Sequence, residues 1–168
     1  MLFYVNYIDL LILVVFSLIL GNNFTDEDKN AEEEIQRKEQ PDVTLLRARL
    51  LFDGGYYHRS LKEMLSKPVS AFTSFRDQLE VTYRFARIFH KLNETDKAIE
   101  YYERTLRNGE NSKFYFAANS ALMLGNIYEE KGNYKEAKIY YLHCLDLRHH
   151  DYQNSIDQKA KAGIDRLK

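Results

Sequence analysis

The sequence predicts an all-α fold made of three helical hairpins and a C-terminal capping helix, preceded by an apolar N-terminal helix. Two prolines and seven glycines in 168 residues are too few turn residues for an all-β protein. A hydrophobic share of 45% and a charged share of 29% are typical of a globular chain. Small residues recur at Ala48, Ala86 and Gly125, first 38 and then 39 residues apart, and such a period is typical of stacked helical hairpins.

Residues 1–24 form an apolar segment that has two interpretations. The run Leu10–Leu20 is 11 residues long, whereas a membrane-spanning helix needs about 20 apolar residues. Extending the run toward the N-terminus includes Asp9, which is costly inside a bilayer, and no basic residue of a signal peptide precedes Lys29. The segment is therefore either a membrane anchor or uncleaved signal, or a helix that packs against protein.

An acidic helical linker is expected over residues 25–40. Residues 21–40 contain seven acidic and three basic residues, a net charge of −4, whereas residues 41–168 contain 17 acidic and 21 basic residues, a net charge of +4. Consecutive acids such as those at residues 32–34 normally form a solvated helix face. Neither charge indicates nucleic-acid binding, which needs a strongly basic patch.

The clearest hairpin is expected over residues 113–149. Its signature residues occur at fixed spacings: Leu124, Gly125, Tyr128, Gly132, Tyr134, Ala137 and Tyr141. Small Gly125 and Ala137 let two antiparallel helices approach closely, and the tyrosines fill the space around that contact. Gly132 ends the first helix and Asn133 favours the turn.

Two earlier segments repeat this pattern with substitutions. The second hairpin is expected over residues 79–109, and its equivalent residues are Phe85, Ala86, Phe89, Ala98 and Tyr102. Asn93 replaces the turn glycine there, and asparagine tolerates a left-handed backbone. The first hairpin is expected over residues 41–68, and its equivalent residues are Ala48, Leu51, Gly55, Tyr57 and Ser60.

A capping helix is expected over residues 152–168. Its small and apolar residues fall on one helical stripe: Ile156, Ala160, Gly163, Ile164 and Leu167. Asn154 or Ser155 is suited to cap its N-terminus. Because the end of a helical array exposes an apolar face, this helix is expected to cover the third hairpin.

The third hairpin resembles the tetratricopeptide repeat at all seven signature positions given above. Ala121 stands in place of the first aromatic residue of the motif, and Cys144 in place of its closing small residue. The resemblance extends over residues 41–168 and implies a right-handed superhelix that acts as a scaffold for a protein or peptide partner. The chain also resembles the C-terminal part of larger proteins of this family.

In tetratricopeptide-repeat proteins the first helix of each hairpin lines a concave groove that holds the ligand. The resemblance implies these candidate partner-binding residues: Leu45, Arg49, Phe52, Asp53, Tyr83, Arg87, His90, Lys91, Asn119, Leu122, Asn126, Glu129 and Glu130. Arg49 and Arg87 are suited to pair with carboxylates, and Asn126 to bond a peptide backbone. Leu45 and Arg49 stand where the family's receptors for chaperone C-termini need lysine and asparagine, so that function is not expected.

No catalytic, cofactor or metal site is predicted. Cys144 is the only cysteine, which excludes an intrachain disulfide and a cysteine-based zinc site, and it occupies a position where the motif needs a small buried residue. His149 and His150 are adjacent, so on a helix they would point about 100° apart and could not share a metal ion. Gly54 and Gly55 lack the Lys-Ser/Thr of a phosphate-binding loop.

The sequence therefore predicts a non-enzymatic interaction scaffold with a protein or peptide partner, no cofactor and no nucleic acid. If residues 1–20 act as an anchor, the protein is membrane-associated or exported; otherwise a cytoplasmic location is expected. The alternative is a truncated, regulatory or structural fragment whose N-terminal helix packs on the first repeat and which has no ligand of its own.

Overall fold

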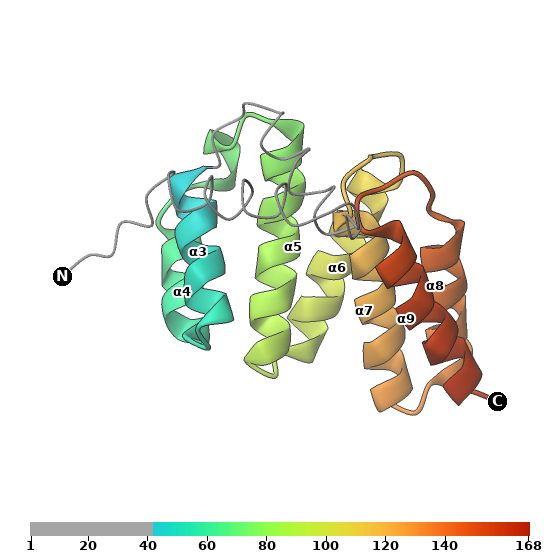
Figure 1. Cartoon of the computed structure of the whole chain (residues 1–168). Coiled ribbons are helices and arrows are strands. Elements are labelled where there is room, and N and C mark those ends of the chain that lie inside the picture. The colour runs from blue at the N-terminus through green and yellow to red at the C-terminus, as the bar shows by residue number, and fades with distance from the viewer. Residues whose placement is uncertain (1–41) are drawn as a thin grey trace, which may run out of the picture. The chain divides into compact units, whose positions relative to one another are not determined.

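The computed structural model describes residues 42–168, which form helices and no strands (Figure 1). The helices are α3 (Val43–Asp53), α4 (Tyr57–Leu65), α5 (Phe75–Lys91), α6 (Thr95–Gly109), α7 (Phe116–Glu130), α8 (Tyr134–Asp146) and α9 (Gln153–Arg166). A short 3-10 helix, η1 (Val69–Ala71), joins α4 to α5. The apolar segment predicted over residues 1–24 and the linker predicted over residues 25–40 lie outside the described residues.

The helices form three successive hairpins. In each hairpin, α3 with α4, α5 with α6, and α7 with α8, the two helices pack against each other, and α6 also packs on α7. The final helix α9 packs on both α7 and α8, so it covers the last hairpin (Figure 1). The predicted fold class, an all-helical array of hairpins with a C-terminal capping helix, is confirmed for the described part of the chain.

The turn inside each hairpin has the same backbone geometry. A residue with positive φ stands at the equivalent place in all three: Gly55 (φ 79°), Asn93 (φ 61°) and Gly132 (φ 72°). The next residue donates its backbone N–H to the carbonyl five residues earlier, as in the bond of 2.9 Å from Asn133 to Tyr128. This pairing satisfies carbonyls left free at the helix end. The prediction that Asn93 substitutes for glycine in a left-handed turn is confirmed.

Side-chain caps fix where several helices begin. Asp42 accepts from the backbone N–H of Thr44 at 2.9 Å, and Ser74 accepts from that of Asp77 at 3.0 Å. The capping helix differs from the prediction, because Asn154 and Ser155 lie inside α9 and do not cap it.

A different arrangement precedes α9. The chain turns through left-handed residues at His149 (φ 63°) and Tyr152 (φ 60°). The backbone N–H of His149 donates to the side chain of Gln153 at 2.9 Å, and the helix begins at Gln153. The bonds of this turn therefore place the helix start before the two predicted capping residues.

The Tyr141 ring holds the third hairpin and the capping helix together. The ring is fully buried, and two glycines face it from different helices. A Cβ atom added at Gly125 of α7 or at Gly163 of α9 would lie only 2.5 Å from a ring carbon. Since real Cβ atoms do not approach so closely, both helices can reach the ring only because these positions lack a side chain.

Within residues 42–168, no helix combines the length and the apolar character that crossing a membrane requires.

Gly163→Ala tests the close packing on Tyr141. Alanine is the better helix former by about 1 kcal/mol, so propensity alone would stabilise α9. The steric conflict with the buried ring is expected to outweigh this gain and to lower the melting temperature by several degrees. Thermal unfolding measures the effect, with Ala162→Ser at the exposed neighbouring position as the control. An unchanged or raised melting temperature would contradict the packing described.

Candidate partner-binding groove

The predicted groove residues all lie on the first helices of the hairpins, α3, α5 and α7, but they differ in exposure. Four are buried in the core: Leu45, Phe52, Tyr83 and Leu122. Five are half-buried: Arg87, His90, Asn119, Asn126 and Glu129. Four are exposed: Arg49, Asp53, Lys91 and Glu130. A partner in the groove would therefore meet the last two groups, whereas the buried four support the floor beneath them.

Arg87 links the first hairpin to the second. Its guanidinium carbon lies 4.2 Å from the centre of the Phe52 ring on α3 and 5.8 Å from that of Tyr83 on α5. This stacking is a cation–π contact, and it leaves the N–H donors at the edge of the guanidinium plane free to bond elsewhere. Among residues 42–168, no carboxylate forms an ion pair with Arg87.

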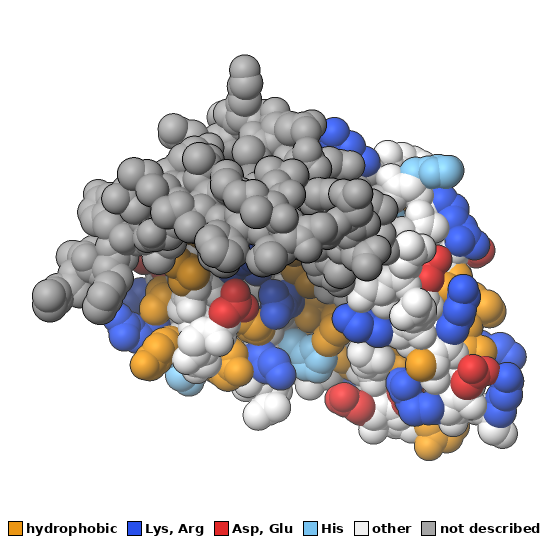
Figure 2. All heavy atoms as spheres, in the orientation of Figure 1, with side chains coloured by type: hydrophobic (Ala, Val, Ile, Leu, Met, Phe, Trp, Pro, Cys, Tyr) orange, Lys and Arg blue, Asp and Glu red, His pale blue; other side chains and the backbone are white. Residues whose placement is uncertain are grey.

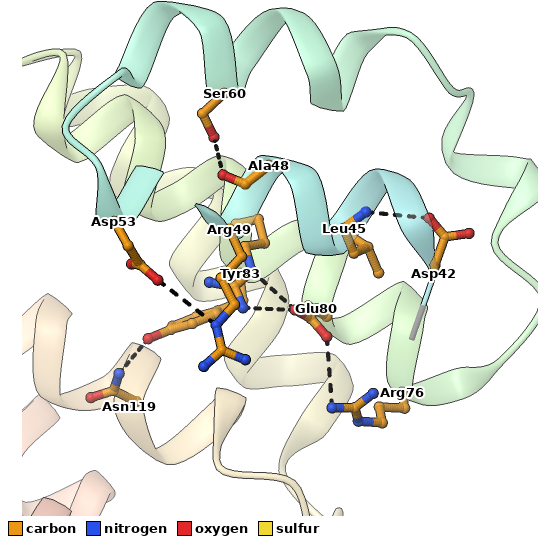
Figure 3. A network of polar contacts seen from close by, with 11 residues as sticks. Asp42, Leu45, Ala48, Arg49, Asp53, Ser60, Arg76, Glu80, Tyr83 and Asn119 are labelled. Carbon is orange, nitrogen blue, oxygen red and sulfur yellow. Dashed lines mark hydrogen bonds and ion pairs between the residues drawn. The ribbon is translucent and has the colours of Figure 1, made fainter. Parts of the chain in front are cut away.

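Tyr83 links the second hairpin to the third. Its hydroxyl accepts a hydrogen bond from the side-chain amide of Asn119 on α7 (Figure 3). Burial raises the pKa of Tyr83 above its ordinary value, so the phenol is neutral at physiological pH. With those of Arg87, these contacts connect α3, α5 and α7 to one another.

Arg49 and Asp53 form a solvated pair on α3. Their side chains lie 3.8 Å apart, four residues apart on the helix, and both are about half exposed (Figure 3). Such surface pairs contribute only about 0.3–0.5 kcal/mol. Both side chains therefore remain available to a partner. Figure 2 shows that lysine and arginine side chains are spread across one face of the array, with acidic side chains scattered between them.

A buried ion pair on α5 was not predicted from the sequence. Glu80 accepts hydrogen bonds of 3.0 and 2.7 Å from Arg84, and both residues are more than nine-tenths buried. Arg76 lies 4.0 Å from the other oxygen of the same carboxylate (Figure 3). The spacing of four residues on one helix was the available signal. The two buried charges compensate each other. The pair therefore stabilises α5 beneath the candidate groove and is not itself exposed to a partner.

In the third hairpin the groove contains its own ion pair. Glu129 accepts two hydrogen bonds of 2.8 Å from Arg166 of α9, a bidentate arrangement. The Tyr141 hydroxyl lies 2.5 Å from a Glu129 oxygen and 2.7 Å from the side-chain oxygen of Asn126. Arg166 was not predicted as a site residue, because no local pattern reveals a contact across 37 residues. A partner would have to compete with this network.

The hydrogen bonds from Arg166 lower the pKa of Glu129 to about 2, against the opposing effect of burial, and Tyr141 adds to the lowering. Glu129 is therefore fully ionised at neutral pH, and its charge is already balanced by Arg166.

Two hollows lie at equivalent places in the second and third hairpins. The smaller, of about 290 Å³, is lined by residues that include His90, Lys91, Thr95 and Ile127. The larger, of about 840 Å³, is lined by the residues 39 positions later: Glu129, Glu130, Tyr134 and Arg166. Where the second hairpin has His90 and Lys91, the third has Glu129 and Glu130, and Glu130 also lines the smaller hollow.

His90 and Cys144 are titratable residues that could suggest catalysis, and burial shifts the pKa of each. Burial lowers the pKa of His90 against the opposing charge of Glu130, and Lys91 adds to the lowering, so the imidazole is mainly neutral at pH 7. Burial and the charge of Asp157 raise the pKa of the Cys144 thiol to about 12, so the thiolate is scarce. Within residues 42–168, no group of His, Cys, Asp and Glu side chains is arranged to hold a metal ion.

Glu129→Gln tests the ion pair through its pH dependence. A carboxylate whose pKa falls from 4.5 to about 2 on folding contributes stability above pH 4.5, and this contribution is lost as the pH falls toward 2. The variant is expected to lose about 1 kcal/mol of unfolding free energy at pH 7 and to show a flatter pH dependence below pH 4.5. Denaturant unfolding at several pH values measures both effects.

Glu100→Gln, at an exposed carboxylate of α6, is the control and should follow the unmodified protein. Parallel pH profiles for the Glu129 variant and the unmodified protein would contradict the assigned ion pair.

Comparison with known proteins gives a family match for part of the chain. Residues 77–149 match the family model described as tetratricopeptide repeat, and this segment runs from α5 to the end of the third hairpin. No curated protein and no solved structure matches the chain significantly. The family is a non-catalytic scaffold that commonly mediates protein–protein interaction. The resemblance seen in the sequence is thereby confirmed over residues 77–149, the segment that matches the tetratricopeptide-repeat family.

Proposed function

We propose that this chain catalyses no reaction and binds a protein or peptide partner along the groove lined by α3, α5 and α7. The observation that carries the proposal is the series of contacts through Phe52, Arg87, Tyr83 and Asn119, which joins all three hairpins beneath the half-buried and exposed groove residues. An extended or helical segment contacts several repeats of such an array at once. The half-buried Arg87 offers hydrogen-bond donors near its centre.

Charge reversal in the groove tests this proposal. Arg49→Glu with Arg87→Glu places two acidic side chains on the surface and is expected to weaken partner binding at least about tenfold. The matched control is Arg104→Glu with Arg107→Glu on α6, where both arginines are exposed and pair with glutamates four residues earlier.

Quantitative affinity purification of the full chain from its native cells, followed by titration of the captured partner, measures the effect. Equal loss of binding in the groove and control variants, or no loss in either, would contradict the groove assignment. Circular dichroism confirms that each variant is folded.

A second candidate function follows from an uncovered face of α3. Val43, Leu46 and Leu50 are exposed by 59, 41 and 62% and lie along one side of the helix. An array of hairpins normally covers such a face with a neighbouring element. This observation favours the alternative in which the N-terminal helix predicted over residues 1–20 packs on the first repeat and the chain has a structural or regulatory role.

Membrane fractionation separates tethering from packing of residues 1–20. If the segment anchors the scaffold, the full chain sediments with membranes and detergent releases it. If the segment packs on the first repeat, the chain is monomeric without detergent, and Leu46→Asp with Leu50→Asp lowers the melting temperature by several degrees. The control is Ile139→Asp with Leu142→Asp, two comparably exposed apolar residues of α8, which should have less effect.

A further inference from the structure

The larger of the two hollows lies at the third hairpin and is lined from three helices. Asn126, Glu129 and Glu130 come from α7, Tyr134 from the start of α8, and Arg166 from the end of α9. Its volume of about 840 Å³ falls within the range of roughly 300–1,000 Å³ that is typical of ligand pockets. The side chains that line it are therefore within reach of a partner.

One wall of this hollow is fixed by bonds within the chain. Arg166 donates two hydrogen bonds of 2.8 Å to Glu129, and the Tyr141 hydroxyl bonds to the side-chain oxygen of Asn126 at 2.7 Å. A carboxylate of this wall therefore already binds a guanidinium group. Because these bonds form before a partner arrives, binding costs less side-chain ordering.

Glu130 is the carboxylate of the hollow whose charge no ion pair balances. It is exposed, and it forms no ion pair within residues 42–168. The two cations of the lining are already paired, Arg166 with Glu129 at 2.8 Å and Lys168 with Asp165 at 2.6 Å. An incoming cation therefore meets the uncompensated negative charge of Glu130.

The smaller hollow, which Glu130 also lines, is less favourable for a cation. Exposed Lys91 contributes a positive charge there. Lys131 lines the same hollow but pairs with Asp96 at 3.7 Å, and His90 is mainly neutral because burial lowers its pKa. A cation that binds Glu130 is therefore expected to approach from the larger hollow.

Tyr134 contributes an aromatic ring to the larger hollow. It is 59% exposed, and among residues 42–168 no cation and no other ring stacks on it. Elsewhere in the chain, the guanidinium carbon of Arg87 lies 4.2 Å from the centre of the Phe52 ring. A guanidinium group is planar, so it can stack on a ring while the donors at its edge bond to a carboxylate.

Resting on the proposed groove function, we propose that Glu130 and Tyr134 form a subsite for an arginine side chain of the protein partner. The partner's guanidinium bonds to Glu130 as Arg166 of this chain bonds to Glu129, and its plane stacks on the Tyr134 ring. A lysine ammonium group is a point charge without a planar face or paired donors, so the subsite prefers arginine to lysine.

Fluorescence anisotropy of the full chain with labelled peptides tests this preference. The probes are acetylated, amidated hexaarginine and the matched hexalysine and hexacitrulline peptides, since citrulline keeps the shape of arginine without its charge. The unmodified protein is expected to bind hexaarginine at least about threefold more tightly than hexalysine, and hexacitrulline most weakly. Equal affinity for hexaarginine and hexalysine would overturn the subsite.

Glu130→Gln removes the charge and keeps the size of the side chain. It is expected to lower the hexaarginine affinity about threefold. Glu100→Gln removes an equal charge from an exposed position of α6 and is the control. Equal loss in the two variants would mean that the peptide responds only to net charge, and this result would also overturn the subsite.

Two variants of Tyr134 separate the ring from its hydroxyl. Tyr134→Leu removes the ring and should lower the hexaarginine affinity about threefold, whereas Tyr134→Phe keeps the ring and should bind like the unmodified protein. Thermal unfolding confirms that both variants are folded, as expected for substitutions at an exposed position. Unchanged affinity in Tyr134→Leu, or equal losses in the two variants, would rule out stacking on the ring.

The subsite and the proposed function fail separately. If Arg49→Glu with Arg87→Glu releases the native partner but Glu130→Gln binds hexaarginine like the unmodified protein, the groove function stands and the subsite is wrong. If the groove variant retains the native partner while Glu130→Gln loses hexaarginine affinity, the subsite stands and the proposed groove function is wrong.

Discussion

The close approach of two helices around a buried side chain is the constraint on which the rest of this array depends. It is tightest at Tyr141, where Gly125 and Gly163 leave no room for a methyl group. The equivalent buried side chains are Tyr102 in the second hairpin and Met64 in the first, where Ser60 also donates to the Ala48 carbonyl at 2.7 Å. Each hairpin therefore needs a small residue opposite a large one, and this need produces the repeat in the sequence.

The same constraint connects folding to function. A tyrosine packed between two helices directs its hydroxyl toward the groove, as Tyr141 does toward Glu129. In the third hairpin this polar end is satisfied by the chain, and Arg166 ties the capping helix to it. In the second hairpin the hydroxyl of Tyr102 lacks an acceptor among residues 42–168. The core packing thus satisfies this polar end in the third hairpin and leaves it without a hydrogen bond in the second.

The repeat pattern was enough to predict the fold because the period reflects local packing. The left-handed turn at Asn93 could be predicted, since it needs only one residue that tolerates positive φ. The start of α9 could not, because it depends on a hydrogen bond from the backbone N–H of His149 to the side-chain oxygen of Gln153. Local propensity favoured Asn154 and Ser155 as caps, but the turn that precedes the helix places both residues inside it.

The candidate site was harder to predict than the fold. Alignment with the motif predicts on which side of its helix a residue lies. How deeply its side chain is buried depends on the other side chains that pack against it. Leu45 and Leu122 therefore proved to be core residues although they occupy groove positions. The pairing of Glu129 with Arg166 lacked any local signal, whereas the four-residue spacing of Glu80 and Arg84 was visible in the sequence.

The central proposal is that a partner binds along the groove lined by α3, α5 and α7. Titration of the isotopically labelled full chain with the captured partner, followed by amide chemical shifts, tests it most directly. The account predicts that the largest shift changes fall on α3, α5 and α7. Changes confined to α4, α6 and α8 would contradict it.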